Sequence, residues 1–287
     1  MPKTLEHSFV EQAPILRLED LNKSYGDGCE YCSKEDAVLE KNICPKCHTV
    51  HALRGVNLEV YPGEIVGVVG ESGSGKSTLM QCIYFDKNPS SGACYLTPYK
   101  EGTENIFEVS EQEKLKIKNL ILGMVYQNPY LGLRMDFSSL SNIAERQIAA
   151  GSRNVHEMMD RSDELLSEVN ISKWRAKEAP KNFSGGMQQR VQIAKALSSN
   201  PPILLLDEVT TGLDLSVQAR VLDLIKDIMH EFNISMLVVS HDLGVIKMLA
   251  ERTYVMLDGK VVESGLTDQI LEDPQHPYTQ QLVYSLL

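Results

Sequence analysis

The sequence predicts an α/β fold built around a largely parallel sheet. The first observation is that strand-like and helix-like stretches alternate along most of the 287 residues. The second is a set of short, continuously apolar runs, which are typical of strands buried on both faces of a sheet. The third is a glycine-rich loop between the first of these runs and a helix. The apolar runs are residues 64–70 (EIVGVVG), 120–127, 202–208 and 235–241.

Two further strands are expected at the N-terminal side of this sheet. Residues 15–21 and 52–60 alternate apolar and polar side chains, which predicts an antiparallel flank. A helix is expected from Lys76 to about Phe85, directly after the glycine-rich loop. The loop therefore lies between a buried strand and the N-terminus of a helix.

Residues 129–200 are predominantly helical in character and predict a helical subdomain inserted into the α/β core. The stretches 155–170 and 184–199 carry helical apolar spacing. Another helix is expected after Asp214, with one apolar face toward the core. That face carries Val217, Val221, Leu224, Ile225 and Ile228.

Composition excludes several classes of function. The net charge of −11 argues against a chain that binds nucleic acid through its overall field, because phosphate contacts need clustered Lys and Arg. No apolar run approaches the roughly 18–20 residues that span a bilayer. Residues 1–14 contain no apolar stretch of the kind found in signal peptides. We therefore expect a cytoplasmic protein, whose membrane role, if any, needs a separate subunit.

The glycine-rich loop at residues 70–77 (GESGSGKS) has the pattern of a phosphate-binding P-loop. Its glycines let backbone N–H groups turn toward phosphate oxygens at a helix N-terminus. We expect Lys76 to reach the β- and γ-phosphates of ATP and the Ser77 hydroxyl to bind Mg²⁺. The expected nucleotide-binding residues here are Gly70, Glu71, Ser72, Gly73, Ser74, Gly75, Lys76, Ser77 and Thr78.

The buried run 203–208 (ILLLDE) ends in two carboxylates. Open α/β sheets bind their ligands at the carboxyl ends of the strands. Asp207 is therefore expected to hold Mg²⁺, directly or through water. Glu208 is expected to act as the general base that polarises the attacking water. With the P-loop, this pair predicts hydrolysis of ATP to ADP and phosphate.

One stretch, residues 183–190 (FSGGMQQR), carries a resemblance to a known family. The chain resembles the ATP-binding-cassette (ABC) ATPases, whose signature loop has this pattern and opens a helix. Small residues at a helix start suit a phosphate. The resemblance implies that Ser184, Gly185 and Gly186 contact the nucleotide of a second subunit. Met187 stands where the family usually has Gln.

The resemblance assigns further site residues. Tyr25 is expected to stack on adenine, and Gln127 (VYQNP) to touch Mg²⁺ and the water. Asp214 closes the loop 211–214 (TGLD), which resembles the family's communication loop between subunits, and His241 (VVSHDL) is the expected γ-phosphate switch. One departure is Val209, since Pro usually follows the acidic pair. The expected catalytic residues are thus Glu208, His241 and Gln127, and the expected Mg²⁺ ligands are Ser77, Gln127 and Asp207.

The resemblance covers residues 14–287 and implies an ABC ATPase domain that works as a head-to-tail dimer. The second ABC subunit is either identical or different. Each ATP is expected between the P-loop of one subunit and the signature loop of the other. A C-terminal segment, residues 260–287, contains a His-Pro-Tyr-Thr element at 276–279.

This element narrows the branch of the family. It is shared by ATPases of oligopeptide and nickel importers and by the K subunit associated with carbon–phosphorus lyase. The combination of residues 183–190 with residues 210–220 (TTGLDLSVQAR), together with 128–134 (NPYLGLR) and 142–146 (NIAER), looks most like the lyase-associated branch. That likeness implies a non-transport ATPase that docks on the soluble lyase complex and remodels it in phosphonate catabolism. The alternatives are an oligopeptide, dipeptide or nickel importer ATPase with a membrane permease, and a nucleotide-gated scaffold with negligible turnover.

Residues 26–50 form an insertion with two cysteine pairs, Cys29 with Cys32 and Cys44 with Cys47. Four thiolates at this spacing predict a structural Zn²⁺ site of zinc-ribbon type. An iron–sulfur cluster, a redox dithiol and unligated thiols remain as alternatives. Because the insertion follows Tyr25, we expect it beside the adenine edge, where it serves partner docking. Cys82 and Cys94 are expected in the core.

Overall fold

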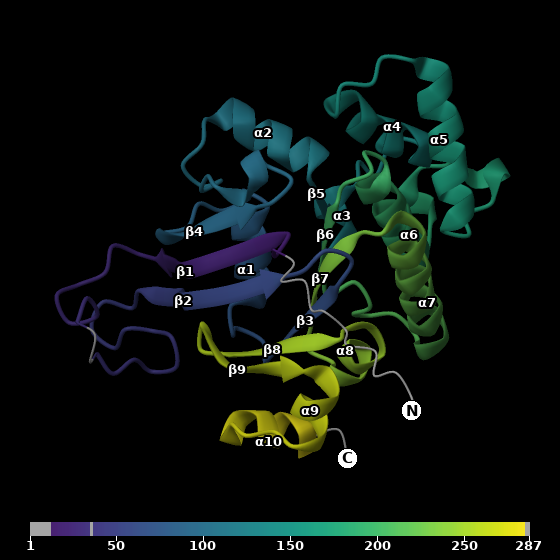
Figure 1. Cartoon of the computed structure of the whole chain (residues 1–287). Helices are drawn as coiled ribbons and strands as arrows, with labels where there is room; N and C mark the ends of the chain where they lie inside the picture. Colours follow the sequence, from purple (N-terminus) through teal and green to yellow (C-terminus); the bar gives the residue numbers. More distant parts are fainter. Residues whose placement is uncertain (1–12, 35–36, 285–287) are drawn as a thin grey trace, which may run out of the picture.

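The computed structural model describes residues 13–34 and 37–284, and two sheets form its frame (Figure 1). The larger sheet has the strand order β5-β6-β7-β3-β8-β9, and the smaller one has the order β2-β1-β4. The larger sheet comprises β3 (Ile65–Val69), β5 (Leu122–Val125), β6 (Ile203–Asp207), β7 (Ser235–Ser240), β8 (Arg252–Leu257) and β9 (Lys260–Leu266). The smaller sheet comprises β1 (Leu16–Tyr25), β2 (Val50–Val60) and β4 (Ser91–Leu96). The expected α/β fold is confirmed.

The larger sheet is parallel except for its last strand, because β9 pairs with β8 in the antiparallel direction. All five residues of β3 are buried, as the apolar run predicted. Successive residues of this strand face different cores: Val66 and Val68 belong to one apolar cluster, and Ile65 and Val69 to the other. A central parallel strand must be apolar on both faces, so no alternation is visible in its sequence.

Helices cover the two faces of this sheet. The first face meets α1 (Lys76–Ile83) and the smaller sheet, and the other meets α6 (Gly185–Leu197), α7 (Leu215–Phe232) and α8 (Leu243–Leu249). The predicted stripe of α7 faces the core: Val221, Leu224, Ile225 and Ile228 are buried, and Val217 packs against them. Cys82 and Cys94 are fully buried, as predicted.

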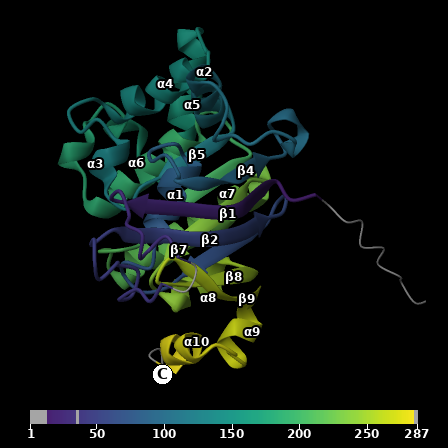
Figure 2. The same cartoon turned by 90° about the vertical axis from the view of Figure 1, so that its left-hand side faces the viewer.

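Residues 129–200 hold the helices α3 (Pro129–Gly132), α4 (Ser139–Ala149), α5 (Val155–Glu168) and α6. They gather at one end of the molecule, with α4 and α5 farthest from the smaller sheet (Figure 1). The structure adds α2 (Glu111–Leu120), which the sequence did not predict and which contacts β5. At the opposite end, α9 (Thr267–Glu272) and α10 (Pro277–Tyr284) lie beyond β9 in both views (Figures 1 and 2).

Several predicted boundaries are wrong by a few residues. The strand expected over 15–21 extends to Tyr25, and the strand expected from residue 52 begins at Val50, so the segment between these strands is 26–49. Helix α1 ends at Ile83 because Phe85 has a φ of 61°, which an α-helix does not accommodate. The last residues of the predicted ranges 14–287 and 260–287, residues 285–287, lie outside the described residues, as do residues 1–12 of the N-terminal stretch. None of the helices within 13–34 and 37–284 combines the length and the apolar character that a membrane crossing requires.

Candidate nucleotide site and cysteine cluster

The predicted P-loop connects the carboxyl end of β3 to the N-terminus of α1. Gly75 is the N-cap of this helix and has a φ of 104°, a left-handed conformation that side chains rarely adopt. A Cβ atom at Gly75 would overlap the carbonyl oxygen of Ala52 in β2. The loop therefore packs against the backbone of the smaller sheet, and glycine is required at this point for two independent reasons.

Lys76 lies folded over the loop that precedes it. Its Nζ donates hydrogen bonds to the carbonyl oxygens of Gly70 at 2.7 Å and Glu71 at 2.9 Å. Its side chain is buried, and burial lowers the pKa of Lys76, although the carboxylates of Glu208 and Asp207 oppose that shift. The loop thus keeps one ammonium group at the centre of its curve, where phosphate oxygens are expected.

Asp207, the last residue of β6, faces the start of α1. The Ser77 hydroxyl donates a hydrogen bond of 3.0 Å to its Oδ1. Burial raises the pKa of Asp207 to about 6 and the neighbouring Glu208 adds to the rise, whereas the Ser77 hydrogen bond and Lys76 oppose it. A hydroxyl and a carboxylate at this distance present oxygen atoms of the kind that Mg²⁺ prefers. The structure therefore brings together two of the three expected magnesium ligands.

The carboxylate of Glu208 contacts both other predicted catalytic residues, Gln127 and His241. Its Oε2 accepts a hydrogen bond from Gln127 Nε2 at 2.9 Å and lies 3.2 Å from His241 Nδ1. The Thr211 hydroxyl donates to the same oxygen at 3.2 Å. Gln127 follows β5 and His241 follows β7, so the ends of three neighbouring strands meet at one carboxylate. Sequence reasoning named Thr211 only as the start of a loop and missed its contact with Glu208.

The backbone at Glu208 is in the left-handed region, with a φ of 46°. Its amide still donates to the carbonyl oxygen of Val239 at 2.9 Å, so the turn leaves β6 while the ladder with β7 continues. The adjacent carboxylates of Asp207 and Glu208 therefore bond to different partners. Val209, where the resemblance expects proline, is buried.

The glycine-rich start of α6 is separate from the P-loop. Ser184 is the N-cap residue of α6, although its side chain makes no capping hydrogen bond. A Cβ atom at Gly185 would meet open space, whereas one at Gly186 would lie 2.6 Å from a methyl group of Val217. Among the described residues, no hydrogen bond joins this helix start to residues 70–78. Met187, which stands where the family usually has Gln, accepts a hydrogen bond of 3.3 Å from Arg175.

Asp214 and Tyr25 lie at exposed positions. Asp214 caps α7 by accepting hydrogen bonds from Ser216 at 2.7 Å and the Val217 amide at 3.0 Å, and the Ser216 hydroxyl keeps the pKa of Asp214 below its ordinary value. Tyr25 ends β1, and 39% of it is exposed. The ammonium of Lys23 stands 5.1 Å from the centre of its ring. An exposed ring at a strand end is able to stack on a flat ligand.

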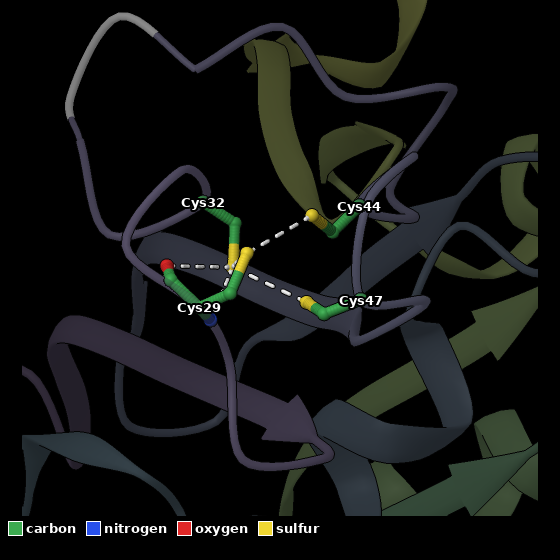
Figure 3. Close-up of side chains that lie close together, drawn as sticks. All are labelled: Cys29, Cys32, Cys44 and Cys47. Atoms are coloured by element: carbon green, nitrogen blue, oxygen red, sulfur yellow. Dashed lines mark hydrogen bonds between the residues drawn. The ribbon is translucent and has the colours of Figure 1, made fainter.

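The four cysteines of the insertion come together, as their spacing predicted. The sulfur atoms of Cys29, Cys32, Cys44 and Cys47 all lie within 4.8 Å of one another and point inward (Figure 3). Three of the six sulfur pairs are separated by 3.7 Å (Cys29 and Cys32), 3.8 Å (Cys29 and Cys44) and 3.7 Å (Cys32 and Cys47). All four are free thiols rather than disulfides.

These separations fit one metal ion. A tetrahedral ion with metal–sulfur bonds of about 2.3 Å requires sulfur atoms about 3.8 Å apart. An iron–sulfur cluster places several atoms between its thiolates and needs them farther apart. His48 and His51 do not belong to the group of possible ligands, and His51 Nδ1 instead lies 3.0 Å from the hydroxyl of Ser24. The donor set is therefore four sulfurs around a space of the size of one ion.

The insertion also touches the P-loop. Asn42 Nδ2 donates to the carbonyl oxygen of Gly73 at 3.4 Å. Thr49 ties the two halves of the insertion together, because its hydroxyl oxygen accepts from the Gly28 amide at 3.0 Å and lies 3.3 Å from the Cys47 sulfur. The cysteine cluster is thus anchored to β2 and lies next to the loop expected to bind phosphate. The sequence predicted a place beside the adenine edge but gave no sign of this contact.

The parallel sheet, the P-loop and the carboxylates at the ends of the strands together define a P-loop nucleoside-triphosphatase domain. Comparison with known proteins specifies the class. Residues 53–211 match the ABC transporter family. The chain is 44% identical over 232 residues to the ATP-binding protein PhnK of Escherichia coli strain K12, which is named for phosphonates utilization; the match covers 81% of this chain and 90% of that protein.

Other relatives belong to transport systems. The chain is 38% identical over 245 residues to the oligopeptide transport ATP-binding protein OppD of Bacillus subtilis strain 168, which covers 83% of this chain and 67% of that protein. The dimeric structure of the cassette MJ0796 with ADP and Pi matches with a TM-score of 0.73 at 30% identity, over 88% of this chain and 98% of that one. CbiO1 of Clostridium perfringens, part of the transporter complex cbiONQ, matches with a TM-score of 0.74 at 26% identity, over 91% and 92%.

The chain therefore belongs to the ABC transporter family. It carries the ABC nucleotide-binding domain and is an ATPase, related both to PhnK and to oligopeptide importer ATPases.

Proposed function

We propose that this ATPase binds Mg·ATP at the site formed by the P-loop and the ends of β6 and β7. Residues 70–78 would wrap the phosphates, and Tyr25 would stack on adenine. Ser77 and Asp207 would hold Mg²⁺ together with Gln127. One observation carries this proposal: the predicted site residues meet at one edge of the larger sheet. The Ser77–Asp207 hydrogen bond and the three groups bonded to Glu208 lie at the carboxyl ends of the parallel strands, where the P-loop also begins.

Glu208 would act as the general base for the attacking water. Its carboxylate is held by Gln127 and His241, and only 13% of its side chain is exposed. A base that is held and shielded in this way is able to orient one water molecule. His241, with 53% of its side chain exposed, would contact the γ-phosphate. Gln127 and His241 would therefore link the nucleotide to the base.

The site is completed by a second ABC subunit. Gly185 opens onto free space at a helix start, and that start makes no hydrogen bond to the P-loop of its own chain within the described residues. We infer that Ser184, Gly185, Gly186 and Asp214 face the nucleotide of a neighbouring subunit. The two similar structures of the cassette MJ0796 are dimers, which supports this arrangement.

The partner that this dimer would drive is the soluble carbon–phosphorus lyase complex of phosphonate catabolism. The support is the 44% identity to PhnK over 90% of that protein, against 38% over 67% of OppD. ATP-driven closure would remodel the lyase complex in the cytoplasm, without transport. An oligopeptide, dipeptide or nickel importer subunit is the second candidate, favoured by the identity to OppD.

The insertion would bind structural Zn²⁺ through four cysteines and resemble a zinc ribbon. Three sulfur separations of 3.7, 3.8 and 3.7 Å support one tetrahedral ion. Cys44 is the one buried ligand, so the lobe has little apolar core and the ion would supply most of its folding energy. We propose residues 26–50 as this insertion, 129–200 as the helical subdomain and 260–287 as a C-terminal segment within a domain over 14–287.

The substitution Glu208→Gln tests the catalytic assignment. An amide cannot take a proton from water, so ATP would stay bound and two subunits would remain together. Size-exclusion chromatography should show a dimer of the variant with Mg·ATP and a monomer with ADP. The rate of ATP hydrolysis by the variant should be less than about one hundredth of the wild-type rate. Undiminished hydrolysis would show that Glu208 is not the base.

A purification from the native host tests the partner. Recovery of the chain with the soluble lyase complex would support the first candidate, and recovery with a polytopic permease would overturn it. Deleting residues 29–47 should weaken assembly with that partner more than it weakens ATP binding. The reverse order of effects would contradict a docking role for the cysteine lobe.

A further inference from the structure

The His-Pro-Tyr-Thr element contacts the P-loop. Tyr278 Oη, on helix α10, accepts a hydrogen bond of 2.7 Å from the backbone amide of Glu71. The two residues are 207 positions apart in the sequence. Glu71 is the second residue of the P-loop, so the C-terminal end of the described chain touches the nucleotide site directly.

Tyr278 is held from behind by strand β9. The carboxylate of Glu263 in that strand accepts the backbone amides of Gln275 at 2.8 Å and His276 at 2.9 Å. His276 Nδ1 in turn accepts the backbone amide of Tyr278 at 3.1 Å. The ring of Tyr278 packs against the larger apolar cluster. A continuous set of contacts therefore runs from β9 through the turn at 275–276 to the P-loop.

The same C-terminal region holds the P-loop at a second point. In the turn between β8 and β9, the amide of Gly259 donates to the carbonyl oxygen of Ser74 at 3.1 Å. The peptide groups of Glu71 are fixed from both sides, because its amide binds Tyr278 and its carbonyl oxygen accepts from Lys76 at 2.9 Å. A lysine that turns to a phosphate gives up that second bond, and the tyrosine bond then remains as the anchor of Glu71.

We propose that Tyr278 is a positioning residue for the ATPase reaction: its hydroxyl fixes the second residue of the P-loop so that the loop keeps its shape before the nucleotide arrives. The role rests on the proposed function of the P-loop as the ATP site. A loop ordered in advance binds its ligand without a further loss of conformational entropy. Loss of the anchor therefore weakens binding of ATP while leaving the groups that perform the chemistry in place.

The substitution Tyr278→Phe removes the hydroxyl and keeps the ring, and Tyr284→Phe is the matched control. Tyr284 lies on the same helix and is 72% exposed. One lost hydrogen bond corresponds to a factor of about five. In Tyr278→Phe, hydrogen exchange of the Glu71 amide in the nucleotide-free protein should accelerate about fivefold, and the KM for ATP should rise about fivefold with kcat changed less than twofold. Tyr284→Phe should leave all three quantities unchanged.

A second variant weakens the same contact from the side of β9. Glu263→Gln weakens the support of the turn at 275–276 without touching the P-loop, and it should accelerate the same amide less strongly. Combined with Tyr278→Phe it should add almost nothing, because both changes act through one contact.

The proposal is overturned if Glu71 exchanges at the wild-type rate in Tyr278→Phe, or if exchange accelerates while the KM for ATP stays the same. A wild-type chain that fails to bind ATP would instead refute the proposed function, and the exchange data would still decide whether Tyr278 orders the loop.

Discussion

Ser77 and Asp207, 130 residues apart in the chain, share a hydrogen bond of 3.0 Å at the point where α1 begins and β6 ends. Ser77 lies in the first turn of α1 and Asp207 is the last residue of β6, so the bond joins the P-loop to the acidic strand end. Their oxygen atoms form the part of the site that would meet Mg²⁺. The carboxylate of Asp207 is buried at this point, and burial raises its pKa although the Ser77 hydrogen bond opposes the rise.

The pKa of Asp207, raised by burial to about 6, makes the stability of the nucleotide-free chain depend on pH. Between about pH 4 and pH 6 the folded chain keeps a proton that the unfolded chain has released. The free energy of unfolding should therefore fall as pH rises through this window, by about 3 kcal/mol from this group. Above the window the ionised carboxylate is present but buried.

Urea unfolding between pH 4 and pH 7 measures this effect, and Asp207→Asn should remove it. The control is Asp268→Asn, at an exposed position of α9. That variant should keep the wild-type slope. An identical pH dependence of the free energy of unfolding in wild type and Asp207→Asn would show that the proton is held elsewhere.

The substitution Thr211→Val should lower turnover with little effect on ATP binding. Valine has the shape of threonine but lacks the hydroxyl that donates to Glu208 at 3.2 Å. The carboxylate then loses one of three groups that orient it, and we expect kcat to fall about three- to tenfold at constant KM. Steady-state kinetics of the dimer measures both. Thr103→Val, at a hydroxyl that bonds only the Lys100 carbonyl oxygen in the described structure, should leave kcat unchanged.

The substitution Gly75→Ala should destabilise the chain and abolish ATP binding. The new Cβ atom combines a left-handed φ of 104° with an overlap on the Ala52 carbonyl oxygen. We expect the free energy of unfolding to fall by about 2–4 kcal/mol. Gly151→Ala separates the two causes, because Gly151 has a φ of 103° with no atom within 4 Å of its Cβ position. The free energy of unfolding of Gly151→Ala should fall by about 1–2 kcal/mol. An equal fall in Gly75→Ala and Gly151→Ala would contradict a role for the Ala52 contact.

Replacing Cys29 and Cys32 together by serine should release the metal ion. Mass spectrometry of the purified chain should find about one zinc per chain in the wild type and none in the double variant. Cys82→Ala, which changes a buried cysteine outside the cluster, should keep the zinc. Unchanged zinc content in the double variant would rule out the ribbon, and iron in place of zinc would assign a different ion.

The sequence predicted the parts of the structure that depend on short stretches. Two features could be recognised because each lies within about twenty consecutive positions. They are the five buried residues of β3 and the four thiols of the insertion. Strand β4 and helix α2 were missed, since β4 is only partly buried and α2 is mostly polar. Helix α1 ends before the predicted residue because Phe85 adopts a left-handed conformation, which no local sequence pattern predicted.

The contacts that complete the site were beyond sequence reasoning for a different reason. Thr211 reaches Glu208 across a turn of three residues, and Asn42 reaches Gly73 from another lobe. Tyr278 was noticed only as part of a motif, although it bonds to a P-loop amide. The contacts of Asn42 and Tyr278 depend on how separate segments are placed in space, and the contact of Thr211 depends on the shape of one turn. The one available signal was that a tyrosine and a histidine stood two positions apart in a motif whose structural role the sequence did not show.

The left-handed backbone of Glu208 separates the duties of two neighbouring acids. In a straight strand, side chains at consecutive positions emerge on opposite faces, and the second acid would have pointed back into the packed interior. A single torsion at the strand's exit releases it into the gap between three strand ends. Under the proposed function, one dipeptide would supply both an acid that faces the metal and an acid that faces the water. A change that straightens this peptide would misplace the second acid without altering its side chain.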